Sequence, residues 1–298
     1  MGMRNIVIAG SGVLGTQIAF QAALHGYDVT VYDIDNDVLE RGRATLIGLG
    51  EYYAKDMAAT PGQIDATLER LTMTGNLGAA LANADLLIES VPEILATKIA
   101  FYEKAAKVAP AKTIFATNSS TLLPSQMADA TGRADKFLAL HFANEIWKRN
   151  IAEVMGHAGT AQATFDAVTA FAGSIGMVTV PVHKERPGYI INSLMLPWVM
   201  AGLKLWADDV AGFKSIDKSW MVATGSNFAP FMLVDIGGMN TAYNMFSSLA
   251  EAYNDPLVAK AAQRIKTEFI DNGLLGAATG EGFYKYPNPE YLSPAFLS

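Results

Sequence analysis

His141 and Glu153 are the residues of this chain whose types and spacing best suit acid–base chemistry. His141 directly follows the apolar run Phe137–Leu140, and Asn144 and Glu153 come within the next 12 residues. Glu153 interrupts the apolar run Ala152–Met155, where a carboxylate is unusual. A carboxylate that holds a histidine fixes its tautomer and tunes its pKa, so the pair can act as a general base. From the position of His141 alone, a buried structural histidine is an equally good explanation.

A run of polar side chains, Asn118-Ser119-Ser120-Thr121, follows another strand-like segment, Thr113–Ala116. Open α/β sheets bind ligands at the carboxyl ends of their strands. Hydroxyl groups at this position could therefore bind a substrate oxygen. The same spacing fits an N-cap for a helix that starts at Pro124, and the sequence leaves both interpretations open.

A glycine-rich turn, Gly10-Ser11-Gly12-Val13-Leu14-Gly15, fits the pattern G-x-G-x-x-G. It follows the apolar run Ile6–Ala9 and opens a helical segment, which is the context that a dinucleotide-binding turn requires. Gly10 permits the tight turn, Gly12 lets the backbone approach a pyrophosphate, and Gly15 allows close packing of helix and strand. The phosphates are expected at the positive end of the helix. The cofactor-binding residues predicted here are Gly10, Gly12, Val13, Leu14 and Gly15.

An acidic residue, Asp33, ends the second apolar run, Val29–Tyr32, 18 residues after Gly15. This is close to the spacing of the acid that binds a ribose 2′-hydroxyl in dinucleotide-binding folds. Its charge would repel a 2′-phosphate, and the first arginine after it is Arg41. NAD is therefore predicted rather than NADP. The structural alternative is a tight strand-to-helix turn with an acidic helix cap.

Short apolar runs alternate with helix-like stretches through the first part of the chain, which is typical of a doubly wound sheet of parallel strands with crossover helices. The predicted strands are Asn5–Ala9, Val29–Tyr32, Leu86–Glu89, Thr113–Ala116, Phe137–Leu140, Ala152–Met155 and Met177–Val182. The predicted helices are Val13–Leu24, Asn36–Ala54, Leu95–Val108, Pro124–Ala130 and Ala161–Ile175. His141 is thus expected at the carboxyl end of a strand, where ligands bind.

The charged segment His183–Gly188 marks a boundary, after which the chain changes character. Residues 188–250 hold only seven charged side chains and six of the 13 methionines, and they lack strand-like alternation. We therefore predict two domains, residues 1–186 and an all-helical domain of residues 187–298. An apolar segment of this kind is more easily buried if two subunits share it, which predicts a homodimer through the C-terminal domain.

Composition limits the possible classes of protein. The chain has 298 residues, of which 51% are hydrophobic and 17% charged, and its net charge is −7. These values exclude a disordered chain and argue against a nucleic-acid partner, which requires a basic face. The absence of cysteine excludes a disulfide framework and a thiolate metal site, and it fits a reducing, cytoplasmic location. No secretory signal, membrane span or metal site is expected, and Ile190–Trp206 is interpreted as a helix buried in protein.

Taken in order, the motifs resemble the L-3-hydroxyacyl-CoA dehydrogenase family, of the short 3-hydroxybutyryl-CoA dehydrogenase type. The similarity covers nearly the whole chain, and the ordered set is specific although no single motif is. The motifs are the Gly10–Gly15 turn, Asp33, Glu89-Ser90-Val91-Pro92-Glu93, Lys98, Asn118-Ser119-Ser120, Leu140-His141-Phe142 with Asn144, Glu153, Arg186-Pro187-Gly188-Tyr189-Ile190-Ile191-Asn192 and Gly280-Glu281-Gly282-Phe283-Tyr284.

The resemblance implies a Rossmann-type NAD domain followed by a helical domain that carries the dimer contact. It implies that His141 is the catalytic base, which removes the proton of a 3-hydroxyl group while the C3 hydride passes to the nicotinamide and a 3-keto product forms. Glu153 would orient this base. The remaining roles it implies are substrate contacts by Ser120, Asn144 and Asn192, and cofactor contacts by Glu93, Lys98 and Asn118.

The chain departs from the family pattern at three places. Phe142-Ala143-Asn144-Glu145 replaces the usual Phe-Phe-Asn-Pro, and Ala277-Ala278 replaces a basic residue. Glu51–Asp56 stands where relatives carry lysine-rich stretches near the CoA nucleotide, so a CoA 3′-phosphate would meet fewer cations. An NAD-dependent dehydrogenase of a free 3-hydroxy acid, similar to gulonate or carnitine dehydrogenases, is therefore an alternative. A non-catalytic NAD-binding protein of the same fold is a second alternative.

Overall fold

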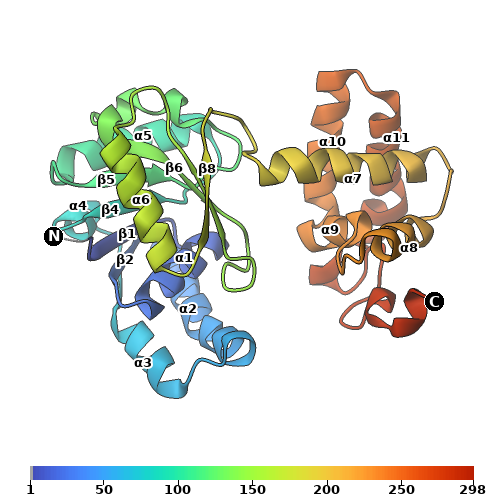
Figure 1. Ribbon diagram of the computed structural model, residues 1–298, viewed down its shortest axis with the longest axis horizontal. Coiled ribbons are helices and arrows are strands. Elements are labelled where there is room, and N and C mark those ends of the chain that lie inside the picture. Colours follow the sequence, from blue (N-terminus) through green and yellow to red (C-terminus); the bar gives the residue numbers. More distant parts are fainter. Residues whose placement is uncertain (1–2) are drawn as a thin grey trace. The chain divides into compact units, whose positions relative to one another are not determined.

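The computed structural model describes residues 3–298. Residues 1 and 2 lie outside the described residues. They belong to the N-terminal segment in which the sequence predicts no secretory signal. The chain forms two compact units, of which the first ends at Ile190 and the second comprises Ile191–Ser298. The first unit contains a sheet covered by helices and the second contains helices (Figure 1). The boundary predicted from the sequence, between residues 186 and 187, falls four residues before this division.

The first unit is built on an eight-stranded sheet with the order β3-β2-β1-β4-β5-β6-β7-β8. All neighbouring strands are parallel except β6 and β7. The strand order reverses between β1 and β4, which is the switch point where doubly wound sheets bind ligands. The strands are β1 Asn5–Ala9, β2 Asp28–Tyr32, β3 Leu71–Thr74, β4 Leu86–Glu89, β5 Ile114–Thr117, β6 Phe137–Phe142, β7 Ile151–Met155 and β8 Val178–Val182.

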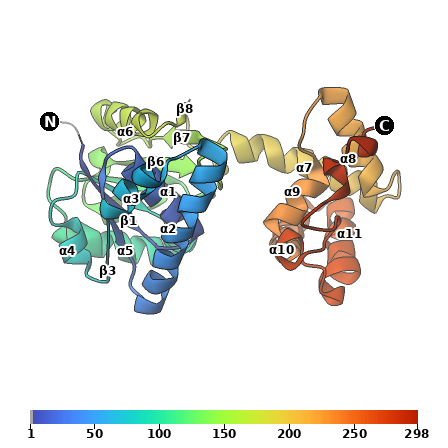
Figure 2. The ribbon, with the colours of Figure 1, turned by 90° about the horizontal axis from the view of Figure 1, so that it is seen from below.

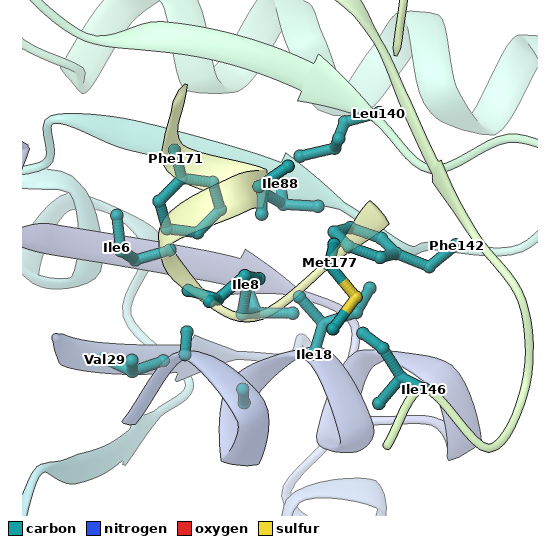
Figure 3. Packing of buried hydrophobic residues seen from close by; sticks show 14 of the residues in the cluster. Ile6, Ile8, Ile18, Val29, Ile88, Leu140, Phe142, Ile146, Phe171 and Met177 are labelled. Carbon is teal, nitrogen blue, oxygen red and sulfur yellow. The ribbon is translucent and has the colours of Figure 1, made fainter. Parts of the chain in front are cut away.

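Helices cover both faces of this sheet (Figure 2). Side chains alternate between the faces along each strand, so Ile6 and Ile8 pack with α1, α2 and α6 while Val7 packs with α4 and α5. The helices are α1 Val13–Leu24, α2 Asn36–Met57, α3 Pro61–Glu69, α4 Leu77–Leu81, α5 Leu95–Val108 and α6 Gln162–Ser174. Figure 3 shows the first of these two cores, with Ile6, Ile8, Ile18, Val29, Ile88, Leu140, Phe142, Ile146, Phe171 and Met177 labelled.

The doubly wound sheet predicted from the sequence is confirmed, with several local differences. The strand β3 and the helices α3 and α4 were not predicted, and residues Pro124–Thr131 form short 3-10 turns instead of the predicted helix. Strand β6 continues to Phe142, so His141 lies within the strand rather than after it. Strands β6 and β7 are antiparallel because the eight residues 143–150 that join them are too few for a crossover connection.

The second unit is helical, as predicted, and has its own hydrophobic core. Its helices are α7 Ile191–Ala207, α8 Phe213–Thr224, α9 Pro230–Gly237, α10 Met239–Tyr253 and α11 Pro256–Arg264, followed by a π-helical turn Ile265–Phe269 and short 3-10 turns. Aromatic side chains from distant segments, Trp206, Phe231, Phe246 and Phe283, meet in the core. Among residues 3–298, no helix combines the length and the hydropathy that a bilayer span requires.

Candidate active site

Ser120, His141 and Glu153 form a continuous hydrogen-bonded chain, which we call the relay. The Nδ1 atom of His141 lies 3.0 Å from Oε2 of Glu153, and its Nε2 atom lies 3.1 Å from Oγ of Ser120. An ionised Glu153 can only accept, so Nδ1 carries the proton and Nε2 accepts from the Ser120 hydroxyl. His141 is 5% exposed and Glu153 is fully buried. The arrangement leaves Nε2 as the basic atom of the relay.

The register of the sheet brings the relay together. His141 in β6 lies directly opposite Glu153 in β7, so their side chains share one face of the antiparallel pair. Ser120 follows the carboxyl end of the neighbouring parallel strand β5. Asn118 joins these strand ends, since its Oδ1 accepts from the amide of Phe142 (3.0 Å) and its Nδ2 donates to Oγ of Ser90 (3.3 Å). The side chain of Asn118 thus connects the ends of β5 and β6 with the segment that follows β4.

Glu93 fixes the segment that carries Ser120. Its Oε1 atom accepts from the amides of Ser120 (3.0 Å) and Thr121 (2.8 Å) and from the hydroxyl of Ser119 (2.5 Å). Burial alone would raise the pKa of Glu93, but these hydrogen bonds and the Lys98 charge outweigh it and lower the pKa to about 2. Glu93 is therefore a permanent anion that positions the serine.

A buried ion pair lies beside Glu93. The Nζ atom of Lys98 is 2.6 Å from Oε1 of Glu89, 3.3 Å from Oε2 of Glu93 and 3.1 Å from the carbonyl oxygen of Val91. Burial raises the pKa of Glu89, and the Lys98 ammonium and a hydrogen bond from Thr117 (2.8 Å) oppose that rise. Lys98 thus joins β4, where Glu89 ends the strand, to the loop that carries Glu93.

The glycine-rich turn leaves room for an anionic group at the start of α1. Gly10 has φ +105°, and a Cβ there would collide with the carbonyl oxygen of Ser90. A Cβ at Gly15 would collide with the carbonyl oxygen of Gly10, whereas one at Gly12 would meet nothing within 4 Å. No side chain caps the first turn of α1. Backbone amides at an uncapped helix N-terminus suit a phosphate, so the turn fits the pyrophosphate of a dinucleotide.

Asp33 lies at the end of β2 beside this turn. Its Oδ2 atom accepts from the amide (2.8 Å) and the hydroxyl (2.9 Å) of Ser11, and its Oδ1 atom accepts from the amide of Ile34 (2.8 Å). A carboxylate offers about four acceptor positions, so a ribose hydroxyl can still bind. Asp33 therefore has a structural contact with the turn in addition to its predicted cofactor role.

Of the other predicted residues, three belong to the first unit and one belongs to the second. In the β6–β7 loop, Asn144 is exposed. Val13 is exposed and Leu14 half-buried in the first turn of α1. Asn192 is the second residue of α7 and belongs to the helical unit. Within the described chain, no group of three or more His, Asp or Glu side chains is arranged to hold a metal ion.

One residue that touches the relay was not singled out from the sequence. The ring of Tyr189 is stacked on His141, with 4.5 Å between ring centroids and 13° between the planes. The only sequence signal was its place in the motif Arg186–Asn192, which suggested no contact with His141. Ser119 was similarly noted only as part of a motif, although its hydroxyl donates to Glu93.

Comparison with known proteins places both units in one family. Residues 5–186 match the model of the 3-hydroxyacyl-CoA dehydrogenase NAD binding domain, and residues 188–286 match the model of its C-terminal domain. A probable 3-hydroxyacyl-CoA dehydrogenase of Caenorhabditis elegans is 29% identical over 95% of this chain and 93% of that protein. The mitochondrial hydroxyacyl-coenzyme A dehydrogenase of Homo sapiens is 28% identical over 95% of this chain and 91% of that protein.

A solved structure described as substrate-directed dual catalysis of dicarbonyl compounds by diketoreductase is also similar. It is 46% identical in sequence, its TM-score is 0.91, and the match covers 96% of this chain and 100% of that one. The matches extend over the glycine turn, the relay and the helical unit alike. The chain therefore belongs to the 3-hydroxyacyl-CoA dehydrogenase family of NAD-dependent oxidoreductases, which act on CH–OH groups.

Proposed function

We propose that this protein transfers a hydride between NAD and C3 of a 3-hydroxy or 3-keto carbonyl compound, with His141 as the proton acceptor and donor. The observation that carries the proposal is the relay, in which a buried carboxylate holds one imidazole nitrogen and leaves the other to a hydroxyl group. NAD, when bound, supplies the hydride acceptor. The reaction then needs a base that removes the hydroxyl proton, and we assign this role to Nε2 of His141.

In the oxidation direction the substrate 3-hydroxyl would donate to His141 Nε2 in place of the Ser120 hydroxyl, because this nitrogen has a single lone pair. As the proton moves to Nε2, the negative charge of Glu153 stabilises the imidazolium that forms. In the reduction direction the imidazolium returns its proton to the 3-keto oxygen. Ser120 and Asn192 would bind the reacting oxygens, with Asn144 nearby, and this positioning would contribute to the rate.

We also propose where NAD binds. The backbone from Gly10 to Gly15 would bind the pyrophosphate and Asp33 the adenosine ribose, as the open space at Gly12 and the uncapped start of α1 support. Glu93, Lys98 and Asn118 would lie along the nicotinamide half. They follow the carboxyl ends of β4 and β5, next to the switch point of the sheet.

The first candidate substrate is an L-3-hydroxyacyl-CoA such as 3-hydroxybutyryl-CoA. The names of the curated relatives, including the 3-hydroxybutyryl-CoA dehydrogenase of Bradyrhizobium diazoefficiens, which is 28% identical, support this substrate class. The relatives share nearly the full length of the chain, so the match includes both units.

The second candidate is a 3-hydroxy acid or dicarbonyl compound without CoA. Two observations favour it. The structure described as a diketoreductase is 46% identical, against 28% and 29% for the relatives named after CoA substrates. At the end of α2, Asp56 accepts a hydrogen bond from Nε1 of Trp147 (2.9 Å) and forms an ion pair with Lys148 (2.9 Å). The charge of Lys148 is therefore already paired with a carboxylate. A CoA 3′-phosphate gains little from a cation that is already paired.

The deciding experiment compares the two candidates on one enzyme preparation. NADH formation is followed with (S)-3-hydroxybutyryl-CoA and with free (S)-3-hydroxybutyrate, and NADH consumption with acetoacetyl-CoA and with a 3,5-diketo ester. A kcat/KM for the thioesters at least tenfold above that for the others supports the first candidate, and the reverse order supports the second. His141→Gln, assayed in parallel, provides the background. Absence of turnover with all four compounds contradicts the proposed function.

We further propose that the protein is a homodimer that forms through the helical unit and works in the cytoplasm. Exposed apolar side chains in this unit support the dimer, and the lack of cysteine supports a reducing compartment. The exposed residues include Leu194, Leu205, Val210, Trp220, Val222 and Tyr253. Light scattering coupled to size-exclusion chromatography should give twice the mass of 31.9 kDa, and a monomer at micromolar concentration contradicts the dimer.

A further inference from the structure

Three consecutive residues at the end of the first unit each contact a different member of the relay. They are Gly188, Tyr189 and Ile190, and we call them the 188–190 clamp. The amide of Gly188 donates to the carbonyl oxygen of Ser120 at 3.1 Å. The ring of Tyr189 stacks on that of His141, with 4.5 Å between the centroids. The amide of Ile190 donates to Oε1 of Glu153 at 2.8 Å.

Tyr189 is itself firmly held. Its side chain is 1% exposed, and its hydroxyl donates to the carbonyl oxygen of Ser119 at 2.8 Å. Its backbone has φ +52°, in the left-handed region that bulky residues rarely adopt. Such a conformation persists where the surroundings over-determine it, and it occurs often at functional sites. The ring is therefore fixed both at its hydroxyl end and by the backbone that carries it.

The ring of Tyr189 restricts a tilt of the His141 imidazole that its two hydrogen bonds alone would allow. The bonds to Ser120 and Glu153 hold the two ring nitrogens, but they leave the ring able to tilt about the axis through these nitrogens. A tilt would turn the Nε2 lone pair away from a substrate hydroxyl. The Tyr189 ring packs nearly parallel to one imidazole face, 13° from it, and blocks the tilt on that side. An aromatic ring stacked on an imidazole also adds a favourable contact of its own.

We propose that the 188–190 clamp orients the relay and that Tyr189 is a positioning residue for His141, an inference that rests on the proposed role of His141 as base. The amide of Ile190 restrains the other end of the relay, because it donates to Oε1 of Glu153 while His141 contacts Oε2. Helix α7 begins at the next residue, so the clamp leads directly into the helix that carries Asn192. Misplacement of a reacting group by about 1 Å can reduce the rate roughly a hundredfold, so a clamp of this kind has a large effect.

Two substitutions of Tyr189 separate the stacking ring from the hydroxyl. Tyr189→Phe keeps the ring and should retain kcat within about threefold, whereas Tyr189→Leu removes it and should lower kcat roughly 10- to 100-fold, with KM and NADH affinity changed less. Phe171→Leu is the matched control, because Phe171 is also a buried aromatic residue whose ring contacts another ring, that of Tyr27, but it lies in α6 and is not part of the relay. It should lower the melting temperature and leave kcat unchanged. Equal kcat for Tyr189→Leu and the unmodified protein would overturn the proposal, as would an equal loss in Tyr189→Phe.

A second measurement tests the clamp without turnover. The full chain has four histidines, so imidazole 15N signals can be assigned by substituting each of them. The unmodified protein and Tyr189→Phe should show His141 as a single Nδ1–H tautomer with narrow lines. Tyr189→Leu should broaden or shift these signals and leave those of His25 and His157 unchanged. Unchanged His141 signals in Tyr189→Leu contradict the clamp even if no substrate is turned over, whereas a lack of turnover in the unmodified protein contradicts only the proposed function.

Discussion

His141 and Glu153 lie directly opposite each other on the antiparallel strands β6 and β7, and their side chains meet at 3.0 Å. Residues paired in this way are fixed by the backbone ladder rather than by a loop. A slip of one residue in the register would turn Glu153 to the other face of the sheet and break the pair. The short β6–β7 connection therefore fixes both the antiparallel direction of β7 and the distance between His141 and Glu153.

Glu153→Gln should lower kcat by about 10²- to 10⁴-fold while NADH affinity stays within about twofold. The amide keeps the shape of the carboxylate, but it cannot stabilise the imidazolium and can hold the wrong tautomer of His141. Steady-state kinetics and NADH fluorescence titration measure the two quantities. Glu103→Gln, an exposed change on α5, is the control and should match the unmodified protein. Full activity in Glu153→Gln would show that His141 needs no acid partner.

Asp33→Ala should reduce the preference for NAD over NADP at least roughly tenfold, measured as the ratio of kcat/KM values, since about 1.4 kcal/mol of lost repulsion gives that factor. Asp33 also holds the glycine turn through Ser11, so part of any loss could come from the turn. Ser11→Ala controls for this, because it removes the hydroxyl contact and keeps the carboxylate. If Ser11→Ala changes the ratio as much as Asp33→Ala, the charge of Asp33 does not decide the cofactor.

The sequence predicts local patterns better than distant contacts. The Gly10–Gly15 turn and Asp33 were found because each sits next to a strand whose apolar run is plain. The strand β3 was missed because it has four residues, none of them buried. Helix α3 was missed although Thr60 and Gln63 form a capping box at its start, which is a readable start signal.

The site shows the same division. The spacing of His141 and Glu153 suggested a pair, because a hairpin makes residues close in sequence close in space. The place of the run Asn118–Thr121 after a strand left a substrate contact and a helix N-cap both open, and only the resemblance selected Ser120. Its contact with His141 depends on the pairing of β5 with β6, which the sequence does not show. The contact of Tyr189 with His141 could not be predicted, because the chain first forms α6 and β8 and then returns to the site.

Lys98→Met should destabilise the protein by about 3–5 kcal/mol, because it leaves the fully buried Glu89 without its cation. Urea unfolding followed by circular dichroism gives this value. The double variant Glu89→Leu/Lys98→Met removes both charges and should recover part of the loss. Lys104→Met, an exposed change on the same helix, should be neutral. A single variant as stable as the unmodified protein would mean that Glu89 is protonated in the native state.

The stability of the helical unit should depend on pH through Asp217, which is fully buried and accepts from the amide of Phe231 (3.1 Å) and the hydroxyl of Tyr284 (2.9 Å). Burial raises the pKa of Asp217 to about 6 despite these bonds. A carboxyl whose pKa is higher in the folded state binds its proton more tightly there, so its contribution to the unfolding free energy falls as the pH rises from about 4 to 6, by roughly 3 kcal/mol. The difference in unfolding free energy between the unmodified protein and Asp217→Asn should fall over this range, whatever the offset between them. Asp208→Asn, an exposed change, should give a constant difference. Parallel curves for Asp217→Asn would show that Asp217 does not titrate between pH 4 and 6.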